Sequence, residues 1–292
     1  MIKSIIDSDY NSADAVVFGV PYESTASFGG GTHLGPKAVF EVLDSQIELF
    51  DRYSKTEPAY EYRFSSKMLD DVKDKSPEAM VTYVAKQMST EHRFILLIGG
   101  EHSVTIPALQ DLRTKYPNEE ITVVQIDAHF DLREDDSEYN DKNPNIYAHS
   151  TVMRHAYSLG FQLLPIGVRT MYKGEFDFVN DKHIKYFEWG RYDIPVPSIQ
   201  EVIDSITTDR VYLTVDVDGF DPSVMPATGT PVPGGLSWQY GEGLIIELMK
   251  QKKVLGADIV EVATVEHSGQ TEYGAGQLAY HILSGAMCVD NV

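Results

Sequence analysis

Short apolar runs that alternate with longer amphipathic stretches constrain the fold of this chain more than any other feature. The runs lie at residues 15–19, 94–98, 121–126, 163–168, 211–215 and 258–262, and glycine or polar residues follow each of them. Runs this short and this rich in β-branched residues are typical of strands that are buried on both faces of a sheet. We therefore predict a strand at each run.

The amphipathic stretches between these runs predict helices. They lie at residues 36–50, 77–91, 106–116, 198–207, 238–252 and 275–288, and Pro36, Pro77 and Pro107 suit a first helical turn. Strands that alternate with helices predict a mainly parallel α/β sheet. Since no linker, repeat or low-complexity tract interrupts the pattern, we expect a single domain over residues 1–292. The pattern alone fits both a barrel and an open sheet covered by helices.

The charge of the chain limits its partners. It carries 44 acidic against 24 basic side chains, a net charge of −20, which disfavours nucleic acid and anionic membranes and favours small cations. The N-terminus lacks the apolar region of a signal peptide, and no run approaches the roughly 20 apolar residues that span a bilayer. Cys288, the single cysteine, cannot form an intramolecular disulfide and is expected in the core. We therefore expect a cytoplasmic protein.

Ionisable residues gather directly after the predicted strands. His102 follows residues 94–98, the segment 127–131 (DAHFD) follows residues 121–126, the segment 216–218 (DVD) follows residues 211–215, and Arg169 follows residues 163–168. In parallel α/β folds these positions are the carboxyl ends of strands, where binding and catalytic sites are built. We therefore expect these side chains to meet at one edge of the sheet.

The acids and imidazoles among them predict a metal centre. Alternate residues of an extended segment point to the same side, so each of the two segments brings its ligand-type side chains together. A single Asp after a strand is usually a helix cap, but carboxylates packed this closely need a cation to offset their repulsion. Carboxylates and imidazoles without a thiolate suit Mn²⁺ better than a structural zinc ion. The predicted ligands are His102, Asp127, His129, Asp131, Asp216 and Asp218.

Six ligands exceed the needs of one ion that also binds solvent or substrate, so we predict two Mn²⁺ ions per subunit. Two ions roughly 3.5–4 Å apart can lower the pKa of a water molecule enough to supply a nucleophile near neutral pH.

Several segments of the chain, in order, resemble elements of the ureohydrolase family, which includes arginase and agmatinase. They are residues 31–36 (GTHLGP), 99–103 (GGEHS), 127–131 (DAHFD), 216–222 (DVDGFDP) and 227–236 (ATGTPVPGGL). The resemblance extends from about residue 15 to 285. It implies a three-layer α/β/α arginase-like fold, with a central parallel sheet of about eight strands in place of a barrel. It also implies a homo-oligomer, a trimer or a hexamer.

The resemblance also implies a role for each ligand. Asp127 and Asp216 would bridge the two Mn²⁺ ions. His102 and Asp131 would complete the ligands of the first ion. His129 and Asp218 would complete those of the second.

Four residues would act on the substrate. Asp131 would hydrogen-bond the nucleophile and pass a proton to the leaving amine, and His149, aligned with a family His-Gly-Thr element, would shuttle protons. Glu261 would bind the guanidinium group, and Thr230 would contact the substrate with Glu261 and His149. A guanidino substrate would then be cleaved to urea and an amine, which is ureohydrolase chemistry.

The substrate is indicated by a loop that lacks an element of arginase-like members. The chain has no SGNxHG stretch near His149, and residues 132–148 contain five acids against Arg133 and Lys142. An acidic loop favours a substrate with a second positive charge and no carboxylate, so we predict agmatine, which would give putrescine. Arginase, guanidinobutyrase and formimidoylglutamase activities stay open, with Arg154 and Arg169 as candidate partners of an acidic substrate.

Three residues depart from the family pattern. Glu101 replaces the usual Asp beside a ligand, and Thr264 and His267 replace the usual Pro and Asp after Glu261. These changes affect the expected shape of the pocket wall rather than the metal ligands. A single-zinc deacetylase and a non-catalytic relative are the rival classes, and the complete ligand set argues against both.

Overall fold

The computed structural model describes residues 4–88, 93–265 and 268–288, and within these ranges eight strands form one open, parallel sheet. The order across the sheet is β2-β1-β3-β8-β7-β4-β5-β6. The strands are β1 (Ala15–Val20), β2 (Phe64–Met68), β3 (Phe94–Gly99), β4 (Ile121–Ile126), β5 (Gln162–Val168), β6 (Phe187–Glu188), β7 (Arg210–Asp216) and β8 (Lys253–Val260).

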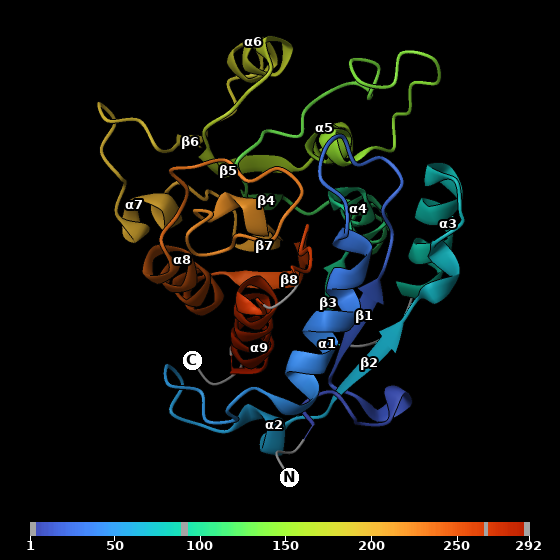
Figure 1. Cartoon of the computed structure of the whole chain (residues 1–292). Helices are drawn as coiled ribbons and strands as arrows, with labels where there is room; N and C mark the ends of the chain where they lie inside the picture. Colours follow the sequence, from blue (N-terminus) through green and yellow to red (C-terminus); the bar gives the residue numbers. More distant parts are fainter. Residues whose placement is uncertain (1–3, 89–92, 266–267, 289–292) are drawn as a thin grey trace.

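Helices cover both faces of the sheet and complete three layers (Figure 1). One face carries α1 (Gly35–Ser45), α7 (Ile199–Asp204), α8 (Trp238–Gln251) and α9 (Gln270–Cys288). The other face carries α3 (Pro77–Met88), α4 (Thr105–Lys115), α5 (Val152–Ser158) and α6 (Lys173–Asp181). The short helix α2 (Pro58–Glu61) lies next to α9. The predicted arginase-like α/β fold is confirmed, and the barrel alternative is excluded by the free edges at β2 and β6.

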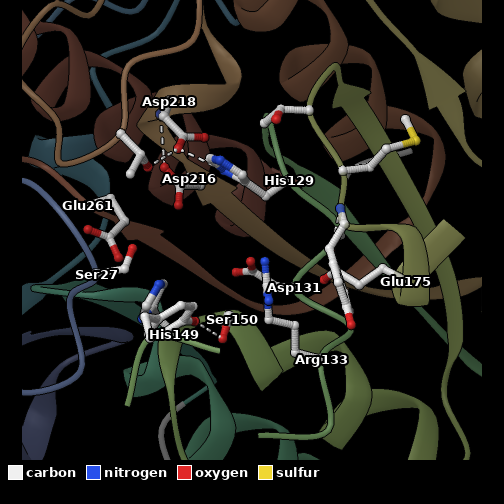
Figure 2. Close-up of a pocket in the computed structure, with 15 residues that line it drawn as sticks. Ser27, His129, Asp131, Arg133, His149, Ser150, Glu175, Asp216, Asp218 and Glu261 are labelled. Atoms are coloured by element: carbon white, nitrogen blue, oxygen red, sulfur yellow. Dashed lines mark hydrogen bonds and ion pairs between the residues drawn. The ribbon is translucent and has the colours of Figure 1, made fainter. Parts of the chain in front are cut away.

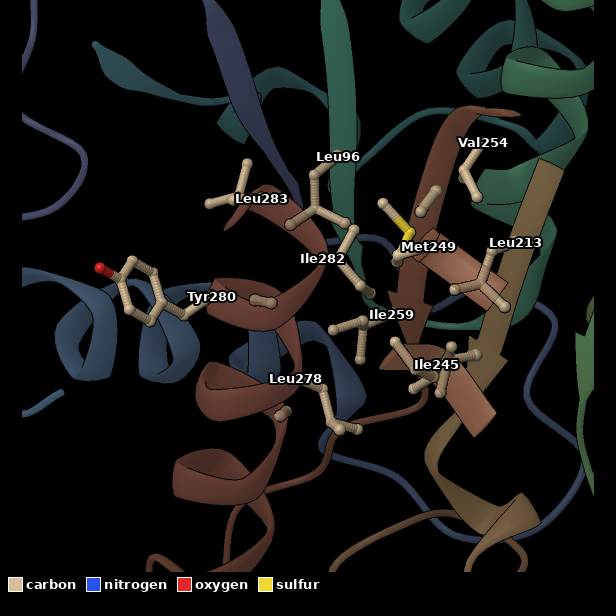
Figure 3. Packing of buried hydrophobic residues seen from close by; sticks show 14 of the residues in the cluster. Leu96, Leu213, Ile245, Met249, Val254, Ile259, Leu278, Tyr280, Ile282 and Leu283 are labelled. Carbon is tan, nitrogen blue, oxygen red and sulfur yellow. The ribbon is translucent and has the colours of Figure 1, made fainter. Parts of the chain in front are cut away.

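Alternate side chains of each central strand supply the two cores. On one face, Leu96, Leu213 and Ile259 meet Ile245 of α8 and side chains of α9, all of them buried (Figure 3). On the other face, the intervening residues of the strands pack against α3, α4 and α5. Burial of both faces explains why the central strands read as unbroken apolar runs.

Several predicted elements need correction. The edge strands β2 and β6 were not predicted, because the segment FSSKM is only half apolar and β6 has two residues. Helices α5 and α6 were also missed. The last strand runs from Lys253 to Val260 and not over residues 258–262, since Glu261 has a positive φ of 62° that ends the strand. The predicted helix at 36–50 ends at Ser45, and residues 89–91 of the helix predicted at 77–91 lie outside the described residues.

The strand order places the predicted site. Strands β3, β8, β7 and β4 are neighbours at the centre of the sheet. His102 follows β3, Glu261 follows β8, Asp216 ends β7, and Asp127 follows β4. The four carboxyl ends therefore bring these residues to one edge, as predicted from the sequence.

Candidate functional site

Two groups of ligand-type side chains lie side by side at this edge of the sheet. Among the described residues, His102, Asp127 and Asp131 form one group and Asp127, His129 and Asp218 form the other, each with its ligand atoms within 4.8 Å of one another. Asp127 belongs to both groups, which is the arrangement expected of a residue that bridges two ions.

The first group surrounds one nitrogen of a buried imidazole. His102 Nδ1 lies 3.3 Å from Asp127 Oδ2, 3.0 Å from Asp131 Oδ2 and 3.5 Å from Asp216 Oδ2. The structure thus adds Asp216 to the neighbourhood of this group.

The second group is built by turns at the ends of β4 and β7. His129 Nδ1 lies 3.4 Å from Asp127 Oδ1 and 3.1 Å from Asp218 Oδ2. Asp127 accepts hydrogen bonds from the backbone N–H of His129 and from Gln125 Nε2 (2.8 Å). Asp218 accepts one from the Ala128 N–H at 3.0 Å, so each turn is held by the carboxylates of the site.

A chain of buried polar side chains fixes which nitrogen of His102 faces the carboxylates. The Thr214 hydroxyl donates to Asp258 Oδ1 at 2.6 Å and lies 2.8 Å from His102 Nε2. Since its proton goes to Asp258, the hydroxyl accepts from His102 Nε2–H. The Nδ1 lone pair is then directed at the three carboxylates, which is how outer hydrogen bonds orient a histidine that binds metal.

The donor set fits divalent cations. Among the described residues His102 Nδ1 is buried and has no hydrogen-bond partner. Burial and the charges of Asp218 and Asp127 raise the pKa of Asp216 well above its usual value. Burial and the charge of Asp127 raise the pKa of Asp131 to about 7. Buried carboxylates that repel each other beside two imidazoles form a donor set that suits divalent cations.

Two residues of the site hold backbone conformations that L-residues rarely adopt. Asp131 has a φ of 52° and Glu261 a φ of 62°, both in the left-handed region. Glu261 Oε1 accepts a hydrogen bond from the backbone N–H of His102 at 2.9 Å. Burial and the charge of Glu101 raise the pKa of Glu261 well above its usual value. Strained residues that carry charged groups into a cavity are typical of functional sites.

His149 is held between two loops. Its backbone N–H donates to Thr25 Oγ1 at 3.0 Å, and its ring stacks on Tyr139 with centroids 5.7 Å apart. Thr25 is fixed in turn, because its N–H donates to Glu101 Oε2 at 2.8 Å. Burial and the nearby imidazoles lower the pKa of His149 to about 4, so its ring is neutral at pH 7. Glu101, which replaces the usual Asp of the family, therefore fixes the loop that carries Thr25.

A cavity of about 340 Å³ lies at this edge of the sheet. It is lined by four of the ligand-type residues and by two of the candidate substrate-binding residues, namely His129, Asp131, Asp216, Asp218, His149 and Glu261. Figure 2 shows Glu261 and Ser27 on one side, His149 below them, and Asp216, Asp218 and His129 across the cavity from His149. Thr230 also lines it, and its hydroxyl donates to Asp218 Oδ2 at 3.0 Å. Arg133, Tyr139, Ser150, Thr170, Met171, Tyr172 and Glu175 line the cavity as well.

Both arginines that were candidate partners of an acidic substrate are engaged elsewhere. Arg169 donates only to backbone carbonyl oxygens among the described residues, those of Gly167, Asp218, Gly219, Phe220 and Val232. It thus holds the turn after β7 and is not free to bind an acidic substrate. Arg154 pairs with Glu134 at 3.5 Å and stacks on Phe178 outside this cavity. Arg133 is the arginine that lines it.

Thr214, Asp258, Gln125 and Thr25 were not predicted from the sequence. Thr214 and Asp258 are polar residues inside apolar strands, and that exception was the available signal. Gln125 carried the same signal, as a polar residue within the apolar run 121–126, whereas Thr25 carried none, since its role depends on a contact with a distant segment. His267 lies outside the described residues, as does the side chain of Cys288.

Comparison with known proteins identifies the family. The Arginase family model matches residues 13–285. The chain belongs to the arginase family. It is 38% identical to the N(1)-aminopropylagmatine ureohydrolase of Synechocystis sp., covering 97% of this chain and 92% of the relative. It is 30% identical to the agmatinase of Halalkalibacterium halodurans, covering 95% of this chain and 94% of that one.

The solved structures agree with this membership. The agmatine ureohydrolase of Thermoplasma volcanium matches with a TM-score of 0.83 and 26% identity, over 100% of this chain and 96% of that one. The arginase-family chain is thus a hydrolase that acts on guanidino C–N bonds. Among the described residues, no helix has the length and apolar character needed to cross a membrane.

Proposed function

We propose that this arginase-family hydrolase holds two Mn²⁺ ions and releases urea from a cationic guanidino amine. The two ligand groups that share Asp127 carry this proposal. When bound, the ions would act as Lewis acids and lower the pKa of a water molecule. Asp127 and Asp216 would bridge them, His102 and Asp131 would bind one, and His129 and Asp218 the other.

The residues of the cavity divide the remaining work. Glu261 places a carboxylate in the wall of the same cavity as the ligand groups, where it would bind and orient the guanidinium through charge-assisted hydrogen bonds. Asp131 would accept the proton of the attacking water and transfer it to the amine that leaves. His149, neutral at pH 7, would carry protons between the cavity and solvent.

We propose agmatine, which would yield putrescine, as one substrate and N(1)-aminopropylagmatine as the second candidate. The second is supported by the 38% identical relative from Synechocystis sp. that carries this name. Arginine and acid-ended substrates are less well supported, because Arg169 and Arg154 are both engaged elsewhere.

A urea-release assay tests this function. The manganese-loaded protein would be given agmatine, N(1)-aminopropylagmatine, arginine and 4-guanidinobutyrate, with urea as the product measured, and formiminoglutamate, with formamide as the product measured. We expect about two manganese ions per chain and urea from the two amine-ended substrates. Failure to release urea from any guanidino compound, with both ions bound, would refute the proposal. The predicted trimer or hexamer can be measured by light scattering on the same preparation.

A further inference from the structure

The cavity of about 340 Å³ that is lined by Glu261 and His149 is called the reaction cavity. Arg133 lies in the wall between the reaction cavity and a second cavity. The second cavity has a volume of about 300 Å³ and shares Arg133, Tyr172 and Glu175 with the first. Figure 2 shows Arg133 and Glu175 on the side of the reaction cavity away from Glu261. A substrate whose guanidinium group is bound by Glu261 would therefore direct its far end toward Arg133.

The positive charge of Arg133 is already engaged. Its Nη1 lies 2.7 Å from Glu138 Oε2. Its guanidinium stacks on Tyr172 at 4.5 Å and lies 5.4 Å from the centre of the Tyr139 ring. An arginine at the end of a substrate cavity normally attracts a carboxylate through a bidentate pair. Here the ion pair to Glu138 engages the Nη1 end of the guanidinium and offsets its positive charge, which weakens that attraction.

Beyond Arg133 the cavity wall is acidic. Its described lining contains the carboxylates of Glu134, Asp135, Glu138 and Glu175 against two guanidinium groups, those of Arg133 and Arg154. Four acids against two bases leave a net charge of −2. The buried carboxylate of Glu175 lies in the wall common to both cavities. A chain end that carries ammonium groups would be attracted along this path, and a carboxylate would be repelled.

The geometry points to Glu138 as the residue that selects the substrate class. By its ion pair with Arg133, Glu138 favours guanidino compounds whose far end carries amines over those that end in a carboxylate. The second cavity receives the far amine of the longer members of this class. The inference rests on the ureohydrolase function proposed above, and it adds a residue and a cavity that determine specificity.

The substitution Glu138→Gln tests this selection, because it removes the charge of Glu138 while keeping its size. Agmatine and 4-guanidinobutyrate have the same carbon chain and differ in the end group, so the ratio of their KM values isolates the charge effect. If the end group of the substrate lies about 6 Å from the unpaired guanidinium of Arg133, their charge interaction changes the binding constant by about tenfold at an intermediate dielectric constant. We expect Glu138→Gln to raise the KM of agmatine, to lower that of 4-guanidinobutyrate, and to leave kcat nearly unchanged.

Two further variants show whether the effect passes through Arg133. Glu247→Gln removes a similar exposed ion pair, to Lys250 at 2.9 Å on α8, and should leave both KM values unchanged. In the double variant Arg133→Gln with Glu138→Gln, the gain for 4-guanidinobutyrate should disappear. For the second cavity, Glu138→Gln should raise the KM of N(1)-aminopropylagmatine more than that of agmatine.

The results separate the two proposals. If the wild-type protein releases urea and Glu138→Gln changes all KM values by the same factor, the selection by Glu138 is wrong and the ureohydrolase function stands. Equal effects on agmatine and N(1)-aminopropylagmatine would refute the role of the second cavity. If the wild-type protein releases no urea from any of these compounds, the proposed function is refuted and the selection proposal with it.

Discussion

The hydroxyl of Thr214 offers a sharp test of how the protein prepares His102 for a metal ion. It accepts from His102 Nε2–H at 2.8 Å and donates to Asp258 Oδ1 at 2.6 Å, and all three side chains are fully buried. Thr214→Val keeps the shape of the side chain and removes both hydrogen bonds. Asp258 keeps its second bond, from the Tyr212 hydroxyl at 2.7 Å, whereas His102 Nε2–H loses its partner.

The magnitude follows from the loss of this one acceptor. A buried donor without a partner costs about 1–3 kcal/mol. Loss of an outer hydrogen bond to a ligand histidine typically weakens metal binding about 10–100-fold, which corresponds to about 1.4–2.8 kcal/mol. Under the proposed function, we expect a loss of this size at the ion that His102 would bind, and little change at the ion that His129 would bind.

Manganese titration by calorimetry, starting from chelator-treated protein, measures both binding steps. Thr214→Ser keeps the hydroxyl and should restore the affinity. Thr122→Val is the matched control, because it removes a buried strand hydroxyl that pairs with Thr208 at 2.8 Å. If Thr214→Val binds both ions as tightly as Thr122→Val does, the hydrogen bond from His102 to Thr214 does not orient the ligand, and the reasoning is wrong.

Three other perturbations have definite expected results. Asp127→Ala removes the residue common to both ligand groups and should reduce manganese affinity more than about 100-fold, beyond the effect of an outer residue, with urea release lost in parallel; a fully active variant would exclude the bridging role. Arg169→Met removes the arginine donor from the carbonyl oxygens of the buried residues Asp218 and Phe220 and should lower the free energy of unfolding in urea by about 3 kcal/mol, so an unchanged midpoint would contradict its structural role. Burial and the imidazoles nearby lower the pKa of His149 from 6.5 to about 4, so between these values the unfolded chain binds more protons at His149 and stability falls as the pH falls. When the pH is lowered from 7 to 5, the free energy of unfolding of metal-free His149→Gln should therefore fall by about 2 kcal/mol less than that of the metal-free wild-type protein. Equal decreases for the two proteins in urea denaturation would show that His149 does not titrate in this window.

The central strands and the gathering of the ionisable residues at one edge of the sheet were predictable because both depend on local pattern. A strand buried on two faces is mostly apolar, as β4 is, and the predicted range 121–126 coincides with Ile121–Ile126. The ligand residues directly follow such runs, so their shared edge followed from parallel topology. Edge strand β2 lacks this pattern because its last three residues are only partly buried.

The contacts across the sheet could not be predicted in the same way. The sequence does not show that β7 and β8, formed late in the chain, lie between β3 and β4. Thr214 on β7 meets Asp258 on β8 and His102 after β3 only because of that insertion. The ion pair of Arg133 and Glu138 likewise depends on the path of an irregular loop, for which local pattern carries little information.

The left-handed backbone at Asp131 and Glu261 has a consequence for the engineering of this protein. Each conformation costs on the order of 1 kcal/mol in an L-residue and nothing in glycine. Glycine at either position should therefore relieve backbone strain in the metal-free protein while removing a side chain of the reaction cavity. A library selected only for thermal resistance would enrich inactive variants at these two positions, so any such selection has to score urea release alongside heat tolerance.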